Sequence, residues 1–125
     1  MIGRKSWREW SYILVMTIPV IYTILIGSAM IFYSGGSLSN PSSKGYSFST
    51  NFLSDLGRTR GYSGKANTIS YALFTLNYLL FGILVIPFFI ATPHLFTENE
   101  LQIKLSKIGS LFGIISAFTL IGVAL

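Results

Sequence analysis

The sequence predicts an all-α integral membrane protein, and two observations support this fold class. Of the 125 residues, 51% are hydrophobic and only 10% are charged, whereas soluble domains carry about 25% charged residues. The apolar residues also gather in three long runs separated by polar segments. Because backbone groups in lipid must be satisfied within the segment, such runs are expected to form helices.

Each apolar run is long enough to be considered as a membrane span. Ser11–Tyr33 contains 23 residues without a charge, and at about 1.5 Å per residue it exceeds a hydrocarbon core of about 30 Å. We expect transmembrane helices over about 11–33, 69–91 and 108–125, within a single transmembrane domain, 1–125. A cleaved signal peptide is the alternative for the first run, but the run is longer than the usual apolar region of about 7–15 residues.

Composition also narrows the classes of function. The chain has no cysteine, which excludes disulfides and thiolate metal sites within it. Its single histidine, His94, argues against a catalytic metal site with three protein ligands. The net charge is +5 and the basic residues flank the apolar runs. We therefore expect contacts with membrane lipids and neither nucleic acid nor a metal or other cofactor.

The distribution of lysine and arginine predicts the orientation. The two expected sides carry five and four basic residues, which are Arg4, Lys5, Arg8, Lys104 and Lys107 on one side, and Lys44, Arg58, Arg60 and Lys65 on the other. The positive-inside rule then favours a cytoplasmic N-terminus in a multi-pass protein of the cell membrane. The connection between the first two spans would face outside.

We expect residues 34–68 to form a long polar loop between the first two spans. Its first half is rich in glycine and serine, whereas its second half mixes apolar and polar residues. We expect a short interfacial helix near 51–57, with Asn51 as its N-cap and Gly57 at its end. Four residues would give that helix an apolar side: Phe48, Phe52, Leu53 and Leu56.

Asp55 is the only acidic residue between Glu9 and Glu98, and two roles for it stay open. In the structural role, it pairs with Arg58 at position i+3 and fixes the loop. In the functional role, it is a general base or a headgroup ligand beside Ser54. Adjacent side chains on a helix point about 100° apart, so Ser54 and Asp55 are not a ready nucleophile–base pair. The catalytic candidates are Ser54 and Asp55, and the ligand-binding candidates are Asn51, Asp55 and Arg58.

Three residues in the expected spans are candidates for helix packing. Asn77 lies near the middle of the second span, where a buried amide is expected to bond to another helix, or else to line a polar pathway. Gly109 and Gly113 form a GxxxG pattern. Such patterns let helix backbones approach closely, within a bundle or between copies.

Ser54-Asp55-Leu56-Gly57, with Asn51 upstream, resembles a motif of the bacterial and archaeal membrane proteins grouped as domain of unknown function family 998. The resemblance implies a six-span helical bundle with this motif shortly before its second span. The order of spans and the loop lengths are similar over most of the chain. The chain would then correspond to the N-terminal half, and it would meet a missing C-terminal half or form a homo-oligomer. The family implies no reaction.

Two hypotheses of function follow, and whether the chain is an enzyme stays open between them. The first is an integral membrane protein of unknown molecular activity that binds lipid or a partner protein at the outer face. The second is an intramembrane lipid hydrolase or transferase that uses Asp55.

Overall fold

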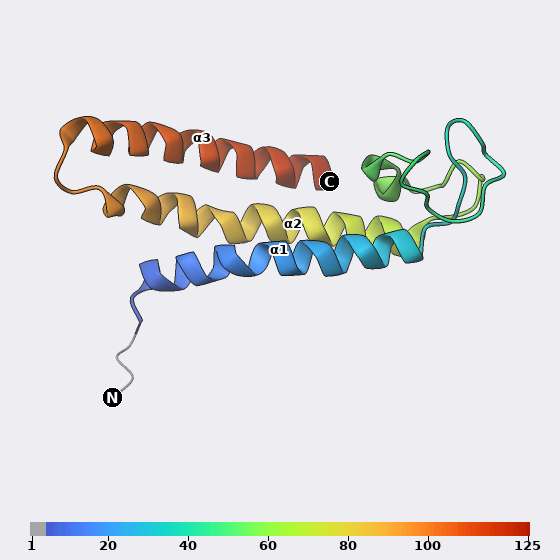
Figure 1. Ribbon diagram of the computed structural model, residues 1–125, viewed down its shortest axis with the longest axis horizontal. Coiled ribbons are helices and arrows are strands. Elements are labelled where there is room, and N and C mark those ends of the chain that lie inside the picture. The colour runs from blue at the N-terminus through green and yellow to red at the C-terminus, as the bar shows by residue number, and fades with distance from the viewer. Residues whose placement is uncertain (1–4) are drawn as a thin grey trace. The chain divides into compact units, whose positions relative to one another are not determined.

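The computed structural model describes residues 5–125, so Arg4 of the orientation argument lies outside the described residues. The elements in chain order are α1 (Trp7–Ile31), the 3-10 helix η1 (Leu53–Gly57), α2 (Thr68–Ala91), the 3-10 helix η2 (Thr92–Leu95) and α3 (Glu100–Ala124), as Figure 1 shows. The three α-helices are long and apolar enough to cross a membrane. The prediction of an all-α fold with three potential spans is confirmed.

The helices bury little of their own apolar surface. In the most apolar window of each, only 17–22% of the residues are buried. Each helix also has exposed leucine, isoleucine or phenylalanine side chains, which form the kind of surface that a lipid environment would cover.

Two helices begin earlier than the apolar runs, because polar residues cap them. In α1, the Ser6 amide donates to Glu9 Oε2 (2.8 Å) and the Glu9 amide donates to Ser6 Oγ (3.4 Å). This reciprocal pair is a capping box, and it starts α1 at Trp7 instead of the predicted Ser11.

The helix α3 also begins earlier than its predicted start at Ile108. Asn99 Oδ1 accepts hydrogen bonds from the amides of Leu101 (2.9 Å) and Gln102 (3.3 Å), so the helix begins at Glu100. Lys104 and Lys107 therefore lie on α3 and not in a loop.

Contacts within the chain group it into two units. The α3 unit comprises the chain up to Val20, Leu79–Val123 and Leu125, and the loop unit comprises Ile21–Tyr78 and Ala124. In the α3 unit, the buried core consists of Ile18, Val85 and Ala117. An added Cβ at Gly82 would lie 2.8 Å from the Ala117 carbonyl oxygen, so α2 and α3 pack closely there.

The loop unit has its own core, which joins the end of α1, η1 and the start of α2. Its buried members are Ile26, Ala29, Tyr33, Leu56 and Phe74. In Figure 1 the teal part of the ribbon, around residue 40, extends beyond the ends of α1 and α2, whereas η1 folds back toward α2. The candidate site around Asp55 lies in this loop unit.

Candidate functional site

The carboxylate of Asp55 is held inside the loop unit. Asp55 is 4% exposed, and its Oδ2 accepts hydrogen bonds from the Phe52 amide (2.9 Å) and from Asn51 Nδ2 (3.1 Å). Phe52 is the N-cap position of η1, so the predicted N-cap role of Asn51 is wrong. Asp55 reaches back from inside η1 to satisfy the amide at its start.

Asn51 connects three segments of the loop instead. Its Nδ2 also donates to the Gly36 carbonyl (2.8 Å), and its Oδ1 accepts from the Ser47 amide (3.1 Å). The amide group is 8% exposed. Asn51 and Asp55 therefore lie together, and the hydrogen bonds of both side chains are made to the chain itself.

Arg58 does not pair with Asp55 within the described residues. Its Nε donates to the Arg60 carbonyl (3.3 Å), and its guanidinium lies 4.2 Å from the centroid of the Tyr62 ring. The i+3 pairing requires one continuous helical turn, but η1 ends at Gly57 and Arg58 is extended (φ −82°, ψ 141°). The predicted ion pair is therefore wrong.

Ser54, the other catalytic candidate, does not share the buried environment of Asp55. Ser54 is exposed whereas Asp55 is buried, in agreement with the expectation that they do not form a pair. His94 is exposed in η2 and meets Trp7 edge-on, with ring centroids 6.0 Å apart. Residues 5–125 contain no group of three or more metal-ligating side chains.

Asn67 has a role that the sequence does not predict, because one of its partners, Ser34, is 33 residues away. Asn67 is 1% exposed. Its Oδ1 accepts from the Ser34 amide (3.1 Å), and its Nδ2 donates to the carbonyls of Leu56 (3.2 Å) and Arg58 (2.9 Å). Ser70 Oγ also donates to the Leu56 carbonyl (3.2 Å). One side chain thus joins the segment after α1 to the end of η1.

Two tyrosines lie near this network. The Tyr33 hydroxyl donates to the Gly36 carbonyl (3.2 Å), and the Tyr33 and Tyr46 rings meet edge-on at 6.0 Å. Burial raises the pKa of both phenols above the ordinary value of 10.0, and the negative charge of Asp55 raises each pKa further. Both hydroxyls therefore stay protonated at neutral pH.

The predicted apolar side of the short helix is divided between two faces. Leu56 is fully buried and Leu53 packs against the core. Phe48 and Phe52, in contrast, are 83% and 64% exposed. The loop unit therefore presents two phenylalanines outward.

A polar cavity of about 400 Å³, called here the lysine cavity, lies between the segment after α1 and the segment before α2. Both lysines of the loop, Lys44 and Lys65, are among its lining residues. The full lining is Ser34, Pro41, Ser42, Ser43, Lys44, Gly45, Ser63 and Lys65. No acidic residue is among these described lining residues.

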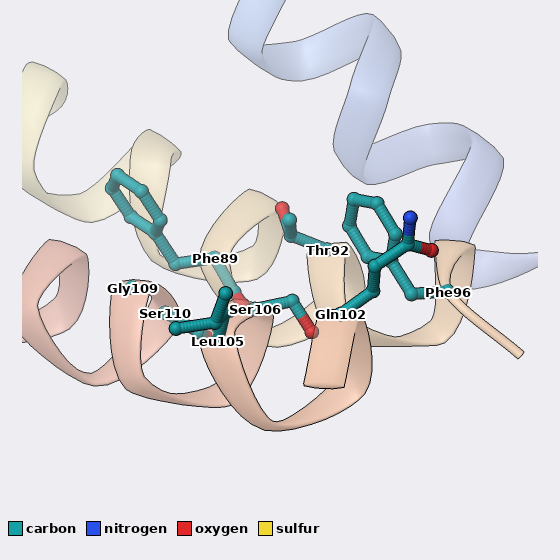
Figure 2. A pocket seen from close by; sticks show the side chains of 8 residues that line it. All are labelled: Phe89, Thr92, Phe96, Gln102, Leu105, Ser106, Gly109 and Ser110. Carbon is teal, nitrogen blue, oxygen red and sulfur yellow. Dashed lines mark hydrogen bonds between the residues drawn. The ribbon is translucent and has the colours of Figure 1, made fainter. Parts of the chain in front are cut away.

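A second cavity, of about 460 Å³, lies in the α3 unit between the end of α2 and the start of α3 (Figure 2). Thr92 Oγ1, in η2, donates to the Phe88 carbonyl of α2 (2.7 Å), and Ser106 Oγ donates to the Ile103 carbonyl of its own helix, α3 (2.8 Å), so both hydroxyls have backbone partners. The walls that remain are mostly apolar. Its lining residues are Phe89, Thr92, Phe96, Gln102, Leu105, Ser106, Gly109 and Ser110.

The packing candidates have different surroundings. An added Cβ at Gly113 would collide with the Phe89 ring, whereas one at Gly109 would meet nothing within 4 Å. Asn77 is 1% exposed, and its Nδ2 has no hydrogen-bond partner among the described residues. The expected bond from that nitrogen to another helix is not formed.

Comparison with family models, with curated proteins and with solved structures gives no match to this chain. The resemblance carried by Ser54–Gly57 therefore stays a prediction.

Proposed function

We propose that this chain is a noncatalytic, multi-pass integral membrane protein that binds membrane lipid through the loop 34–67. One observation carries the proposal. The segment 47–57 folds back beside α2 with the side chains of Asn51 and Asp55 bonded internally and two phenylalanines exposed.

The contacts of η1 indicate its depth along α2. The Leu56 carbonyl accepts from Ser70, and an added Cβ at Gly57 would lie 2.6 Å from the Phe74 ring. Phe74 is six residues beyond Thr68, where α2 begins, which corresponds to about 9 Å along the helix axis. If α2 spans the bilayer, η1 lies beside its first two turns, at the level of the headgroups and the first methylenes.

Irregular backbone at that depth is tolerated only when its polar groups find partners in the protein. Asn51, Asp55 and Asn67 supply such partners to backbone amides and carbonyls of the loop. This accounts for a buried carboxylate in a chain with so few charges. Phe48 and Phe52 then face outward where aromatic side chains favour the interface.

The hydrolase or transferase hypothesis has less support. A general base must come within hydrogen-bond reach of the proton that it removes, but Asp55 is 4% exposed and its Oδ2 already accepts two hydrogen bonds. Ser54 is exposed, so it does not share the buried environment of the Asp55 carboxylate. A binding role uses the same residues without requiring Asp55 to be released.

We also propose the orientation and the association that the sequence suggests. Lys5 and Arg8 near the start of α1 favour a cytoplasmic N-terminus, which puts the loop 34–67 at the outer face of the cell membrane. The Ser54–Gly57 motif supports membership of domain of unknown function family 998. Further spans or a second copy would then complete the bundle.

Depth-dependent fluorescence quenching tests the lipid contact. The native tryptophans are removed as Trp7→Phe and Trp10→Phe, and Phe52→Trp is introduced as the single reporter. The protein is reconstituted into vesicles of phosphatidylcholines brominated at different acyl positions. We expect the strongest quenching from bromines near the headgroup end of the chain.

Leu38→Trp in the same background is the matched control. Leu38 is 68% exposed, close to the 64% of Phe52, but it lies in the glycine- and serine-rich half of the loop, outside the segment 47–57. We expect weak quenching there at every bromine depth. Equal quenching of the two reporters, or none of the Phe52→Trp reporter, would contradict the proposal.

A further inference from the structure

Backbone hydrogen bonds within the loop hold the walls of the lysine cavity in place. The Gly36 amide donates to the Ser43 carbonyl (2.9 Å), and the Ser63 amide donates to the Gly35 carbonyl (3.2 Å). The Gly61 amide donates to the Lys65 carbonyl (3.1 Å). The turn that carries Lys44 and the turn that carries Lys65 are therefore both tied to the segment after α1.

Glycines allow this close approach. Gly36 has a φ of +85°, and an added Cβ there would collide with the Ser63 amide nitrogen. An added Cβ at Gly61 would collide with Ser34 Oγ. The segments thus lie at a distance that side chains at these two positions would prevent, and the cavity between them has a defined shape.

The charge inside and around the cavity is positive. The loop 34–67 contains four basic residues and one acidic residue, a net charge of +3. The one acid, Asp55, is buried and bonded to Asn51 and Phe52. Two basic residues, Lys44 and Lys65, therefore line the cavity, and no carboxylate is among its described lining residues.

One of the lining residues, Ser43, also has a hydroxyl without a partner. Ser43 Oγ is buried and has no hydrogen-bond partner among the described residues, whereas Ser63 Oγ already donates to the Ser34 carbonyl (3.0 Å). A buried polar atom without a partner calls for an explanation, and a ligand that accepts hydrogen bonds supplies one.

We propose that the lysine cavity binds a phosphate group. Its oxygens accept charge-assisted hydrogen bonds from Lys44 and Lys65 and a hydrogen bond from Ser43, which are the donor types that recognise phosphate as a compact anion. At about 400 Å³ the cavity has room for more than the phosphate. The phosphate belongs to a phospholipid headgroup or is free in solution. The headgroup source rests on the proposed function, because it requires the loop to lie at the membrane surface.

Calorimetric titration of the whole chain in a nonionic detergent tests this site. The ligands are inorganic phosphate, dihexanoyl phosphatidic acid and dihexanoyl phosphatidylcholine. The variants are Lys44→Gln, Lys65→Gln and Ser43→Ala. We expect each lysine variant to raise the Kd for the bound phosphate compound about tenfold or more, since a hydrogen bond to a charged group is worth this much.

Lys104→Gln is the matched control, because it removes the same charge from α3, outside the cavity. We expect less than a twofold change in Kd for this variant. Both cavity lysines are exposed, so their substitution is expected to leave folding intact, which thermal unfolding of each variant checks. Raising the salt concentration is expected to weaken binding to the unsubstituted chain.

The outcomes separate the sources of phosphate. Lysine-dependent binding of inorganic phosphate supports a free-phosphate site, and lysine-dependent binding of phosphatidic acid alone supports a headgroup site. Two results would overturn the proposal. One is binding that Lys44→Gln and Lys65→Gln leave unchanged, and the other is no binding of inorganic phosphate or of phosphatidic acid. Quenching of the Phe52→Trp reporter can still succeed in that case, so failure here is distinguishable from failure of the proposed function.

Discussion

In the α3 unit glycines let the helices lie against apolar side chains and a helix backbone, whereas in the loop unit polar side chains bond to irregular backbone. Gly113 lies against Phe89, and Gly82 lies against Ala117 and Ile121. In the loop unit, Asn51, Asp55 and Asn67 form seven of the side-chain hydrogen bonds.

The difference follows from what each backbone can do for itself. A helix satisfies its own amides and carbonyls, so two helices need only shape to pack in lipid. A loop cannot do this, and every buried amide or carbonyl that it leaves unpaired costs free energy. The loop unit therefore depends on polar side chains to satisfy backbone groups that the helices of the α3 unit satisfy for themselves.

The largest expected effect is that of Asn67→Ala. It removes three hydrogen bonds and takes their partner from the partly buried Ser34 amide and Arg58 carbonyl, so we expect a loss of about 3 kcal/mol in the free energy of unfolding. Denaturant unfolding in detergent measures the loss. Amide exchange is expected to increase in the loop unit and not in the α3 unit.

Asn99→Ala is the control for Asn67→Ala. Asn99 is an exposed N-cap of α3, and its removal is expected to cost about 1 kcal/mol. Equal losses for the two variants would show that the loop network is no more important than one helix cap.

Gly82→Ala is expected to cost about 1–3 kcal/mol, because overpacking forces apart helices that cannot yield easily. The obstacle is a backbone oxygen of α3, which would lie 2.8 Å from the new Cβ. Gly109→Ala meets open space and is expected to be neutral or stabilising. Thermal unfolding of both variants measures the contrast, and a reversed order would contradict the close packing of α2 with α3.

Asp55→Asn is expected to cost about 1–2 kcal/mol, since it weakens the charge-assisted bonds to Asn51 and the Phe52 amide. Loosening of η1 would make the nearby Arg58 and Arg60 better substrates for trypsin. The rate of cleavage at these residues measures the effect. Ser54→Ala changes an exposed neighbour and is expected to stay within about 0.5 kcal/mol of the unsubstituted chain. If trypsin cleaves Asp55→Asn as slowly as the unsubstituted chain, Asp55 does not fix the loop.

The smallest expected effect is a dependence on alkaline pH. Burial raises the pKa of Tyr33 in the folded chain above its ordinary 10.0, so the folded state holds this proton more tightly than the unfolded state. The resulting stability is fully present below about pH 10 and is lost as pH rises through the folded pKa. Unfolding between pH 9 and 11 measures it, and Tyr33→Phe is expected to flatten the profile. A profile that is as steep in Tyr33→Phe would assign the effect to another group.

The apolar runs were sufficient to predict the three long helices, because length and hydropathy are local properties. The predicted starts of α1 and α3 were wrong because a polar first turn, capped by Ser6 and by Asn99, precedes each apolar run. The loop network could not be predicted, because its partners are far apart in the chain: Asn67 bonds to Ser34, 33 residues away. The Asp55–Arg58 pairing failed because it assumed a helical turn that ends at Gly57.

Hydrogen–deuterium exchange of the unsubstituted chain in lipid nanodiscs tests the central claim most directly, namely that the loop 34–67 is a folded unit seated beside α2. The amides of Asp55, Arg58 and Asn67 donate to carbonyls within the loop. We predict that these three amides exchange far more slowly than the amides of the exposed residues 38 and 39. Exchange of all these amides at the rate of an unstructured peptide would contradict the account.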